Sequence, residues 1–310
     1  AYPEVPSSDL LLAELIGRGG MGVVLKGRWL GVDVAVKMVG AGSAMARFLE
    51  REAVVLSRLR HPCITPLFGI AHLPGSLALV LELMQRSLRH YLHLRAASAS
   101  FTDEAWLRCR IAREAAAGLA YLHREHYMHR DVKAENVMLD ATLHAKVCDF
   151  GLGVRCSSLE EYADAAEGPL SETHTSGVGT PRYMAPEVAA VERHPSRRVI
   201  YSESCDVYSF GLLLWELTHH GRAFGDVPGS TVAAEYAPAG VRPPLELPAG
   251  FDVWKRLISA CWQQQPALRP SMKRCVVTLC LAGKGLNDKA GCGAAGRVVA
   301  TEEQKRVKEL

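Results

Sequence analysis

The chain has 310 residues, a formal net charge of +3, and 48% hydrophobic and 22% charged residues. These fractions are typical of a folded globular chain, so they exclude wholesale disorder and collagen-like repeats. The charge is nearly balanced for this length, which gives no basis for attracting nucleic acid or an anionic membrane surface. The length predicts roughly two domains, or one large unit with two lobes.

The nine cysteines are odd in number, scattered, and free of any CxxC pair. This pattern favours reduced thiols in a reducing compartment over a disulfide framework. No apolar run is long enough to span a bilayer. The chain starts on Ala1-Tyr2-Pro3-Glu4, without the apolar segment of a secretory signal. We therefore expect a cytoplasmic protein, or the cytoplasmic portion of a larger one.

The first part of the chain is predicted to be rich in strands. Residues 14–40 place strand-like runs on either side of a glycine-rich turn, residues 44–60 have helical spacing, and two more strand-like runs cover 67–71 and 77–83. Long helical patterns follow at residues 88–95, 105–123, 206–218 and 251–263. The sequence thus predicts an α+β chain, with a small β-rich unit followed by a larger helical one. Residues 283–310 form a tail of low hydrophobicity, expected to be loosely ordered or a short exposed helix.

The glycine-rich turn runs from Gly17 to Val24 and contains a GxGxxG pattern. In a dinucleotide-binding fold this pattern opens a helix, whereas here a strand-like run follows, so that interpretation fails. A glycine-rich loop between antiparallel strands can instead fold over a nucleotide and present backbone N–H groups to its phosphates. An ordinary tight hairpin turn is the alternative.

Two charged residues are predicted to meet beneath this loop. Lys37 shares one face of its strand with Ala35, and Glu52 lies on the apolar face of the predicted helix, one turn from Phe48 and Leu56. A carboxylate on a buried stripe needs a cationic partner, and Lys37 is the candidate. The alternatives are a solvated lysine at a strand end and a glutamate at the edge of the stripe.

The segment His129–Asn136 and the later Asp149–Gly151 carry the most specific pattern. One aspartate can serve as a base, while an asparagine and a second aspartate supply the hard oxygen ligands that Mg²⁺ prefers. Lys133, close to Asp131 in the sequence, can neutralise charge on a transferring phosphoryl group.

Taken in order, these segments resemble the eukaryotic protein kinase family over residues 10–282. The motifs that carry the resemblance are Gly17–Val24, Val34–Lys37, Glu52, His129–Asn136, Asp149–Gly151, Ala185–Glu187, Asp206 and Arg269. The resemblance implies a bilobal protein kinase fold, with an N-lobe over 10–84 that contains one key helix and a mainly helical C-lobe over 85–282. It also implies an ion pair between Glu187 and Arg269.

The resemblance further implies a role for each matched residue. The catalytic residues would be Asp131, which accepts or orients the proton of the substrate hydroxyl, with Lys133, Lys37 and Glu52. Asn136 and Asp149 would hold Mg²⁺, with Mn²⁺ as a possible substitute. ATP would be bound by Ile16, Gly17, Gly19, Gly22, Val24, Ala35, Lys37, Leu81, Glu82, Leu83, Met84 and Met138.

Lys133 and Thr180 resemble the serine/threonine-specific pattern, while the segments Trp215–Leu217 and Cys261–Pro270 resemble the tyrosine-kinase-like branch, which includes Raf and mixed-lineage kinases. Dual specificity stays open. We expect a protein substrate, favoured over a lipid or small molecule by Ala185–Glu187 and Thr180. We also expect activation when an upstream kinase, or the chain itself, phosphorylates Thr173, Thr175 or Ser176.

The rival hypothesis is a pseudokinase, which uses the same fold as a scaffold or allosteric switch. A pseudokinase usually lacks at least one of Lys37, Asp131, Asn136 and Asp149, and all four are present. A second open point is substrate selection. Glu135 and Glu216 lie where some kinases select basic residues, but both also suit ordinary structural roles.

Overall fold

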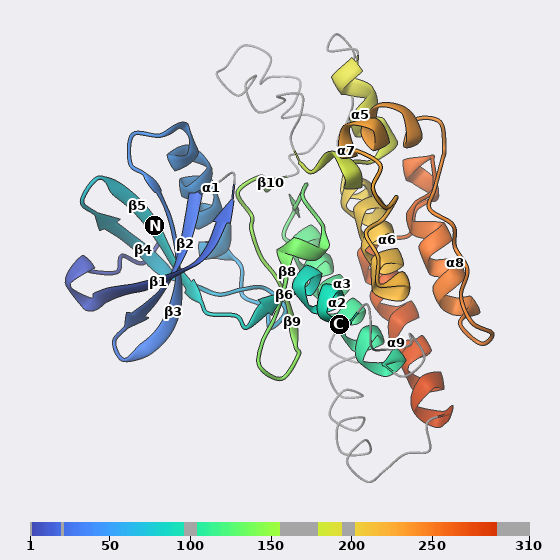
Figure 1. Ribbon diagram of the computed structural model, residues 1–310, viewed down its shortest axis with the longest axis horizontal. Coiled ribbons are helices and arrows are strands. Elements are labelled where there is room, and N and C mark those ends of the chain that lie inside the picture. The colour runs from blue at the N-terminus through green and yellow to red at the C-terminus, as the bar shows by residue number, and fades with distance from the viewer. Residues whose placement is uncertain (1, 20–21, 96–103, 156–178, 194–201, 290–310) are drawn as a thin grey trace.

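The computed structural model describes residues 2–19, 22–95, 104–155, 179–193 and 202–289. Figure 1 shows a lobe of strands with one helix on the left and a lobe made mostly of helices on the right. The predicted bilobal α+β architecture is therefore confirmed. The residues predicted to be phosphorylated, Thr173, Thr175 and Ser176, lie outside the described residues.

The N-lobe is a five-stranded antiparallel sheet in the order β1-β2-β3-β5-β4, with a helix on one side. Its elements are η1 (Ser7–Asp9), β1 (Leu10–Gly19), β2 (Gly22–Trp29), β3 (Val32–Gly40), α1 (Ala44–Arg58), β4 (Leu67–Leu73) and β5 (Ser76–Glu82). The expected strands and helix are all present.

Strand β3 shows why Lys37 reaches the interior between the lobes. Val34 and Val36 are fully buried and pack with Val80 in a small core on the outer face of the sheet. Because successive side chains of a strand alternate between faces, Ala35 and Lys37 point the other way, toward α1. Period-two patterning thus directs the lysine inward.

The C-lobe begins after a short linking segment. Its elements are β6 (Arg86–Ser87), α2 (Leu88–Arg95), α3 (Ala105–Arg124), β7 (Tyr127–Met128), η2 (Ala134–Asn136), β8 (Val137–Leu139), β9 (Ala145–Val147), β10 (Val154–Arg155), η5 (Pro181–Tyr183), α5 (Pro186–Arg193), α6 (Ser204–His219), α7 (Gly229–Thr231), η6 (Val232–Tyr236), α8 (Asp252–Cys261), η7 (Pro266–Leu268) and α9 (Met272–Lys289). A three-stranded antiparallel sheet, β6-β8-β9, and a two-stranded one, β10-β7, flank the segments that carry the predicted catalytic residues.

Helix α6 is the central support of the C-lobe. Phe210, Leu212, Leu213 and Leu214 are all fully buried, which is expected of a helix that is apolar on every side. One continuous core joins α6 and α3 to α1 and β5 of the N-lobe. The two lobes therefore meet through packed side chains as well as through the chain between them.

Helix α9 runs past the start of the predicted tail. We expected residues 283–310 to be loosely ordered or a short exposed helix, and α9 continues through residue 283 to Lys289. Residues 290–310 lie outside the described part of the chain. Within that part, no helix is both long and apolar enough to cross a membrane.

Candidate active site

The loop that carries Asp131 is fixed through its backbone. The carboxylate of Asp206, on α6, accepts the N–H groups of His129 and Arg130, each at 2.8 Å, and the imidazole Nε2 of His123 lies 2.8 Å from Oδ2. Burial alone would raise the pKa of Asp206, but the bond and charge of His123 and these backbone bonds hold it below its usual value. The buried carboxylate of Asp206 on α6 therefore sets the path of the loop.

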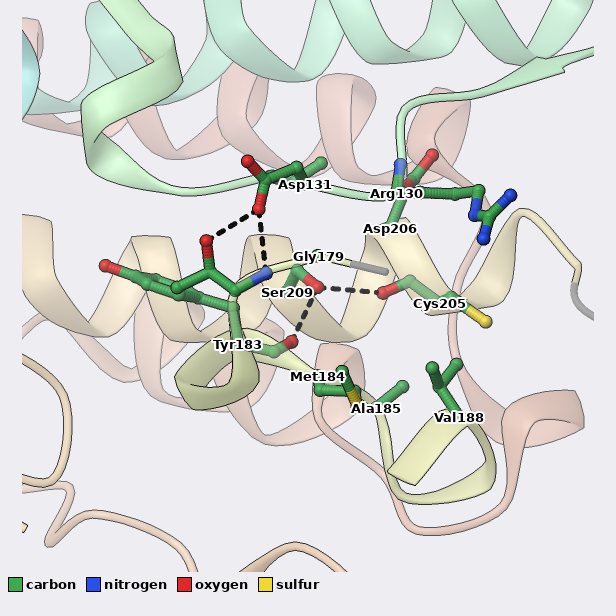
Figure 2. Close-up of a pocket in the computed structure, with 12 residues that line it drawn as sticks. Arg130, Asp131, Gly179, Tyr183, Met184, Ala185, Val188, Cys205, Asp206 and Ser209 are labelled. Carbon is green, nitrogen blue, oxygen red and sulfur yellow. Dashed lines mark hydrogen bonds between the residues drawn. The ribbon is translucent and has the colours of Figure 1, made fainter. Parts of the chain in front are cut away.

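Asp131 is surrounded by donors on both carboxylate oxygens. Oδ1 accepts the backbone N–H of Thr180 at 2.9 Å and its hydroxyl at 2.7 Å, the two dashed lines that leave Asp131 in Figure 2. Oδ2 accepts from Lys133 Nζ at 2.5 Å and from Asn136 Nδ2 at 2.9 Å. The structure thus brings together Asp131, Lys133 and Asn136 as the sequence predicts.

Thr180 reaches Asp131 because a glycine precedes it. Gly179 has a φ of +111°, and a Cβ at this position would lie 2.8 Å from the carbonyl oxygen of Arg130. Only glycine tolerates both this φ and this approach. A hydrogen bond from α6 also holds the segment after Thr180: Ser209 Oγ donates to the carbonyl oxygen of Tyr183 at 2.7 Å (Figure 2).

Farther along this segment, Arg269 and Glu187 form the predicted ion pair. Two guanidinium nitrogens of Arg269 lie 2.6 and 2.8 Å from the two carboxylate oxygens of Glu187. This two-pronged geometry is the strong form of an arginine–carboxylate bond. It ties α5 to the segment just before α9.

Lys37 lies between two carboxylates from different parts of the chain. Its Nζ is 2.7 Å from Glu52 Oε2 on α1 and 2.7 Å from Asp149 Oδ1. The predicted contact with Glu52 is present, and the contact with Asp149 adds a link to the C-lobe. Glu52 Oε1 also accepts the backbone N–H of Phe150 at 3.3 Å.

These contacts set the ionisation of the three residues. Burial disfavours the charged amine of Lys37, but Glu52 and Asp149 outweigh this effect and raise its pKa above the ordinary value. Burial by itself would raise the pKa of Asp149, but the charge and the hydrogen bond of Lys37 outweigh burial and lower this pKa. Burial keeps the pKa of Glu52 raised although Lys37 opposes it. Lys37 and Asp149 are thus held in their charged forms.

The predicted ATP-binding residues surround the same space from the N-lobe side. Val24 pairs with Lys37 across β2 and β3, and Ala35 pairs with Leu81 across β3 and β5. Since directly paired residues point to one face, these side chains face the interior between the lobes. Met138 lies on β8 of the C-lobe.

The segment between the lobes offers open backbone groups. The N–H of Glu82 is bonded to the carbonyl oxygen of Pro66 at 3.2 Å. The backbone groups of Leu83 and Met84 make no hydrogen bond with another described residue. Backbone groups without partners on this segment suit the edge of a purine base.

The glycine-rich loop is described at Ile16, Gly17, Gly19 and Gly22. Gly22 has a φ of +118°, and a Cβ there would lie 2.3 Å from the carbonyl oxygen of Met38. A glycine is therefore required at this turn. Ile16, at the near end of the loop, is 47% exposed.

The two predicted metal ligands keep oxygen atoms available. Asn136 donates from Nδ2 to the carbonyl and carboxylate oxygens of Asp131, which turns its Oδ1 away from these bonds. Asp149 uses Oδ1 for Lys37, and Oδ2 has no hydrogen-bond partner among the described residues. A neutral and an anionic oxygen form the donor set that Mg²⁺ accepts, so these residues fit a divalent metal.

Two parts of this arrangement were not predicted. The bonds from Thr180 to Asp131 lack a local signal, and only the motif that marks Thr180 as part of a serine/threonine pattern points to it. The ion pair between Lys146 on β9 and Glu82 at the end of β5, at 2.5 Å, joins residues distant in sequence. No spacing rule brings such residues together before the fold is known.

Comparison with known proteins agrees with this geometry. The family described as protein tyrosine and serine/threonine kinase matches residues 10–279. The dual specificity protein kinase shkC of Dictyostelium discoideum is 33% identical over 290 residues, which cover 89% of this chain and 52% of that protein. The serine/threonine-protein kinase CTR1 of Arabidopsis thaliana is 34% identical over 276 residues, covering 86% and 31%. Mitogen-activated protein kinase kinase kinase 7 of Bos taurus is 33% identical over 288 residues, covering 89% and 44%.

The chain therefore belongs to the protein tyrosine and serine/threonine kinase family, and the predicted membership is confirmed. These relatives are of the tyrosine-kinase-like type, in agreement with the predicted branch. The chain spans about a third to a half of the length of these three relatives. Membership in the family implies the use of ATP and a divalent metal ion.

Proposed function

We propose that this chain transfers the γ-phosphate of ATP to serine and threonine hydroxyls of protein substrates. The observation that carries the proposal is the set of donors around Asp131, together with the contact of Lys37 with Asp149. The charged side chains to which the family resemblance assigns phosphoryl transfer, Lys37, Asp131, Lys133 and Asp149, are each bonded to another residue of this site, which supports the proposal. The serine/threonine and dual-specificity relatives support the same class of reaction.

Asp131 is the residue that meets the acceptor. Its carboxylate would accept or orient the proton of the incoming hydroxyl, in the place where the Thr180 hydroxyl now donates to Oδ1. Lys133 Nζ, bonded to Oδ2, would stabilise negative charge on the transferring phosphoryl group. Little covalent chemistry falls to the protein, because positioning and fixed charge lower most of this barrier.

Lys37 is the residue that meets the nucleotide. With Glu52 behind it, Lys37 would contact the α- and β-phosphates beneath Gly17, Gly19 and Gly22. Asn136 and Asp149 would hold Mg²⁺, or Mn²⁺ in its place. The bound metal would neutralise charge on the phosphate oxygens. The open backbone groups of Leu83 and Met84 would bind the adenine.

How the enzyme is activated and where it is located in the cell depend on more than the residues that the structure describes. The placement of Arg130 directly before Asp131 supports phosphorylation of Thr173, Thr175 or Ser176, by an upstream kinase or by the chain itself, as the activating event. A cytoplasmic location also stays a prediction. Fractionation and phosphate mapping of the active protein test these two points.

The test is a transfer assay with labelled ATP and Mg²⁺, using generic serine/threonine and tyrosine peptides, beside an Asp149→Ala control. We expect transfer to serine and threonine well above the control. A purified, folded and loop-phosphorylated protein that transfers no more than Asp149→Ala would support the pseudokinase hypothesis instead. Transfer to tyrosine of equal size would establish dual specificity.

A further inference from the structure

One arginine in the C-lobe is bound to two carboxylates from two other elements. Arg89, on α2, donates from Nε to Glu135 Oε1 at 3.2 Å and from Nη2 to Glu216 Oε2 at 2.5 Å. The same Nη2 lies 2.8 Å from the hydroxyl of Tyr183. We call these four residues, Arg89, Glu135, Tyr183 and Glu216, the Arg89 cluster.

The Arg89 cluster adjoins the site where the acceptor would lie. Tyr183 lines the same pocket as Asp131 (Figure 2), and it follows shortly after Thr180, which binds Asp131 directly. Glu135 belongs to η2, the turn that also carries Asn136. An extended peptide advances only about 3.3 Å per residue. A residue a few positions from the acceptor would therefore reach the exposed part of this cluster.

Without Arg89, the two carboxylates would form an anionic site for a basic side chain. Arg89 already fills that role from within the chain. Glu216 is fully buried and also accepts the hydroxyl of Tyr183 at 2.8 Å and the N–H of Ala223 at 2.9 Å. Burial raises the pKa of Glu216, and Arg89 opposes that shift. Neither oxygen of Glu216 is thus left for a ligand.

Of the two carboxylates, Glu135 and Glu216, only Glu135 can be approached by a peptide, since its side chain is 40% exposed. Its Oε1 is bonded to Arg89, and its Oε2 is buried and has no hydrogen-bond partner among the described residues. An arriving arginine or lysine would have to compete with a guanidinium that is already in place and loses no freedom on binding.

We propose that Arg89 is a specificity-determining residue, which occupies the position that a basic side chain of the substrate would take and so removes selection for basic residues near the acceptor. This inference rests on the proposed protein kinase function of the same site. It replaces the hypothesis, open at the sequence level, that Glu135 and Glu216 select basic substrates.

The first test compares acceptor peptides in which each flanking position in turn holds alanine or arginine. For the unaltered protein we expect the ratio of kcat/KM, arginine over alanine, to stay within about threefold of unity at every position. In Arg89→Gln, which keeps a hydrogen-bond donor near Tyr183 and Glu216, we expect the ratio at one position to rise about tenfold or more. A tenfold change corresponds to about 1.4 kcal/mol.

Two control variants make the result specific. Arg95→Gln removes the same charge from the same helix, from an arginine bound to Glu104 instead, and is expected to leave the ratio unchanged. In Glu135→Gln the ratio is also expected to stay near unity, because Arg89 already neutralises that carboxylate. A strong arginine preference in the unaltered protein that Glu135→Gln abolishes would overturn the proposal, and this variant leaves the buried bonds of Glu216 intact.

A binding measurement separates this inference from the proposed function. Fluorescence polarisation of labelled peptides with alanine at the acceptor position requires no transfer. We expect arginine peptides to bind Arg89→Gln about tenfold more tightly than the unaltered protein. If arginine peptides bind Arg89→Gln more tightly but no phosphate is transferred, the result contradicts the kinase function alone. If phosphate is transferred but a folded Arg89→Gln binds these peptides no more tightly, the result contradicts only the role of Arg89.

Discussion

The two halves of the candidate site are held in different ways. Asp131 lies on a loop whose backbone N–H groups are bonded to the buried carboxylate of Asp206 on α6. Strand β3 directs the side chain of Lys37 inward, and its amine is then held by Glu52 from α1 and by Asp149 from the C-lobe. One half is thus fixed by the backbone, and the other is assembled from side chains on both lobes.

This difference predicts different sensitivities. Backbone anchoring fixes the acceptor half as soon as the C-lobe has folded, so a change there should affect chemistry or global stability. The nucleotide half depends on the position of α1 relative to Asp149. A change in that half should reduce activity while the fold persists.

Asp131→Asn should have the largest effect. The substitution keeps the shape of the side chain and removes its charge, so the barrier should rise by the usual contribution of a general base, about 10²–10⁴ in kcat. The unfolding temperature should fall only modestly, because the new amide nitrogen faces donors that now bond a carboxylate oxygen while Asp206 still holds the loop. Steady-state kinetics and calorimetry give the two values. Retention of most activity by this variant would contradict the role of Asp131.

Asp206→Asn should act on stability. Loss of the charge weakens bonds to two backbone N–H groups and an imidazole, and we expect unfolding to become easier by about 3 kcal/mol at neutral pH. The folded pKa of Asp206 is lowered, so its ionised form stabilises the protein above about pH 4, the unfolded pKa. The difference between the two proteins should shrink as the pH falls below that value. Urea titrations at several pH values measure it, and a difference that grows in acid would refute this assignment.

Glu52→Gln should reduce activity without unfolding the protein. Lys37 would lose one charge-assisted bond and keep Asp149, so we expect kcat/KM to fall about 10–100-fold, the equivalent of 1.5–3 kcal/mol. Glu50→Gln, at an exposed position on the same helix, is the matched control. Equal losses in both variants would show that the ion pair with Lys37 is not the cause.

Lys146→Met should have the smallest effect. Its partner Glu82 is partly exposed, and such pairs contribute at most about 1 kcal/mol. A double-mutant cycle with Glu82→Gln, followed by chemical unfolding, isolates the coupling energy. A coupling energy well above ~1 kcal/mol would mean that the contact between the lobes also depends on the ion pair of Lys146 and Glu82.

Much of the fold could be predicted from the sequence because its signals are local. Alternation in Val34–Lys37 directed the lysine inward, and helical spacing put Glu52 on the buried face of α1. The end of α9 was harder to predict, since residues 283–289 have little hydrophobicity of their own and continue a helix that is packed earlier along its length.

The sequence by itself determined the family and the two lobes, and it predicted Lys37, Glu52, Asp131, Asn136 and Asp149 as candidate site residues, because each depends on residue type and on spacing along the chain. Only the tertiary structure decided which atoms meet. Thr180 binds Asp131, and Arg89 lies between Glu135 and Glu216. These contacts join elements far apart in sequence, and long-range contacts form only when burial of the core brings those elements together.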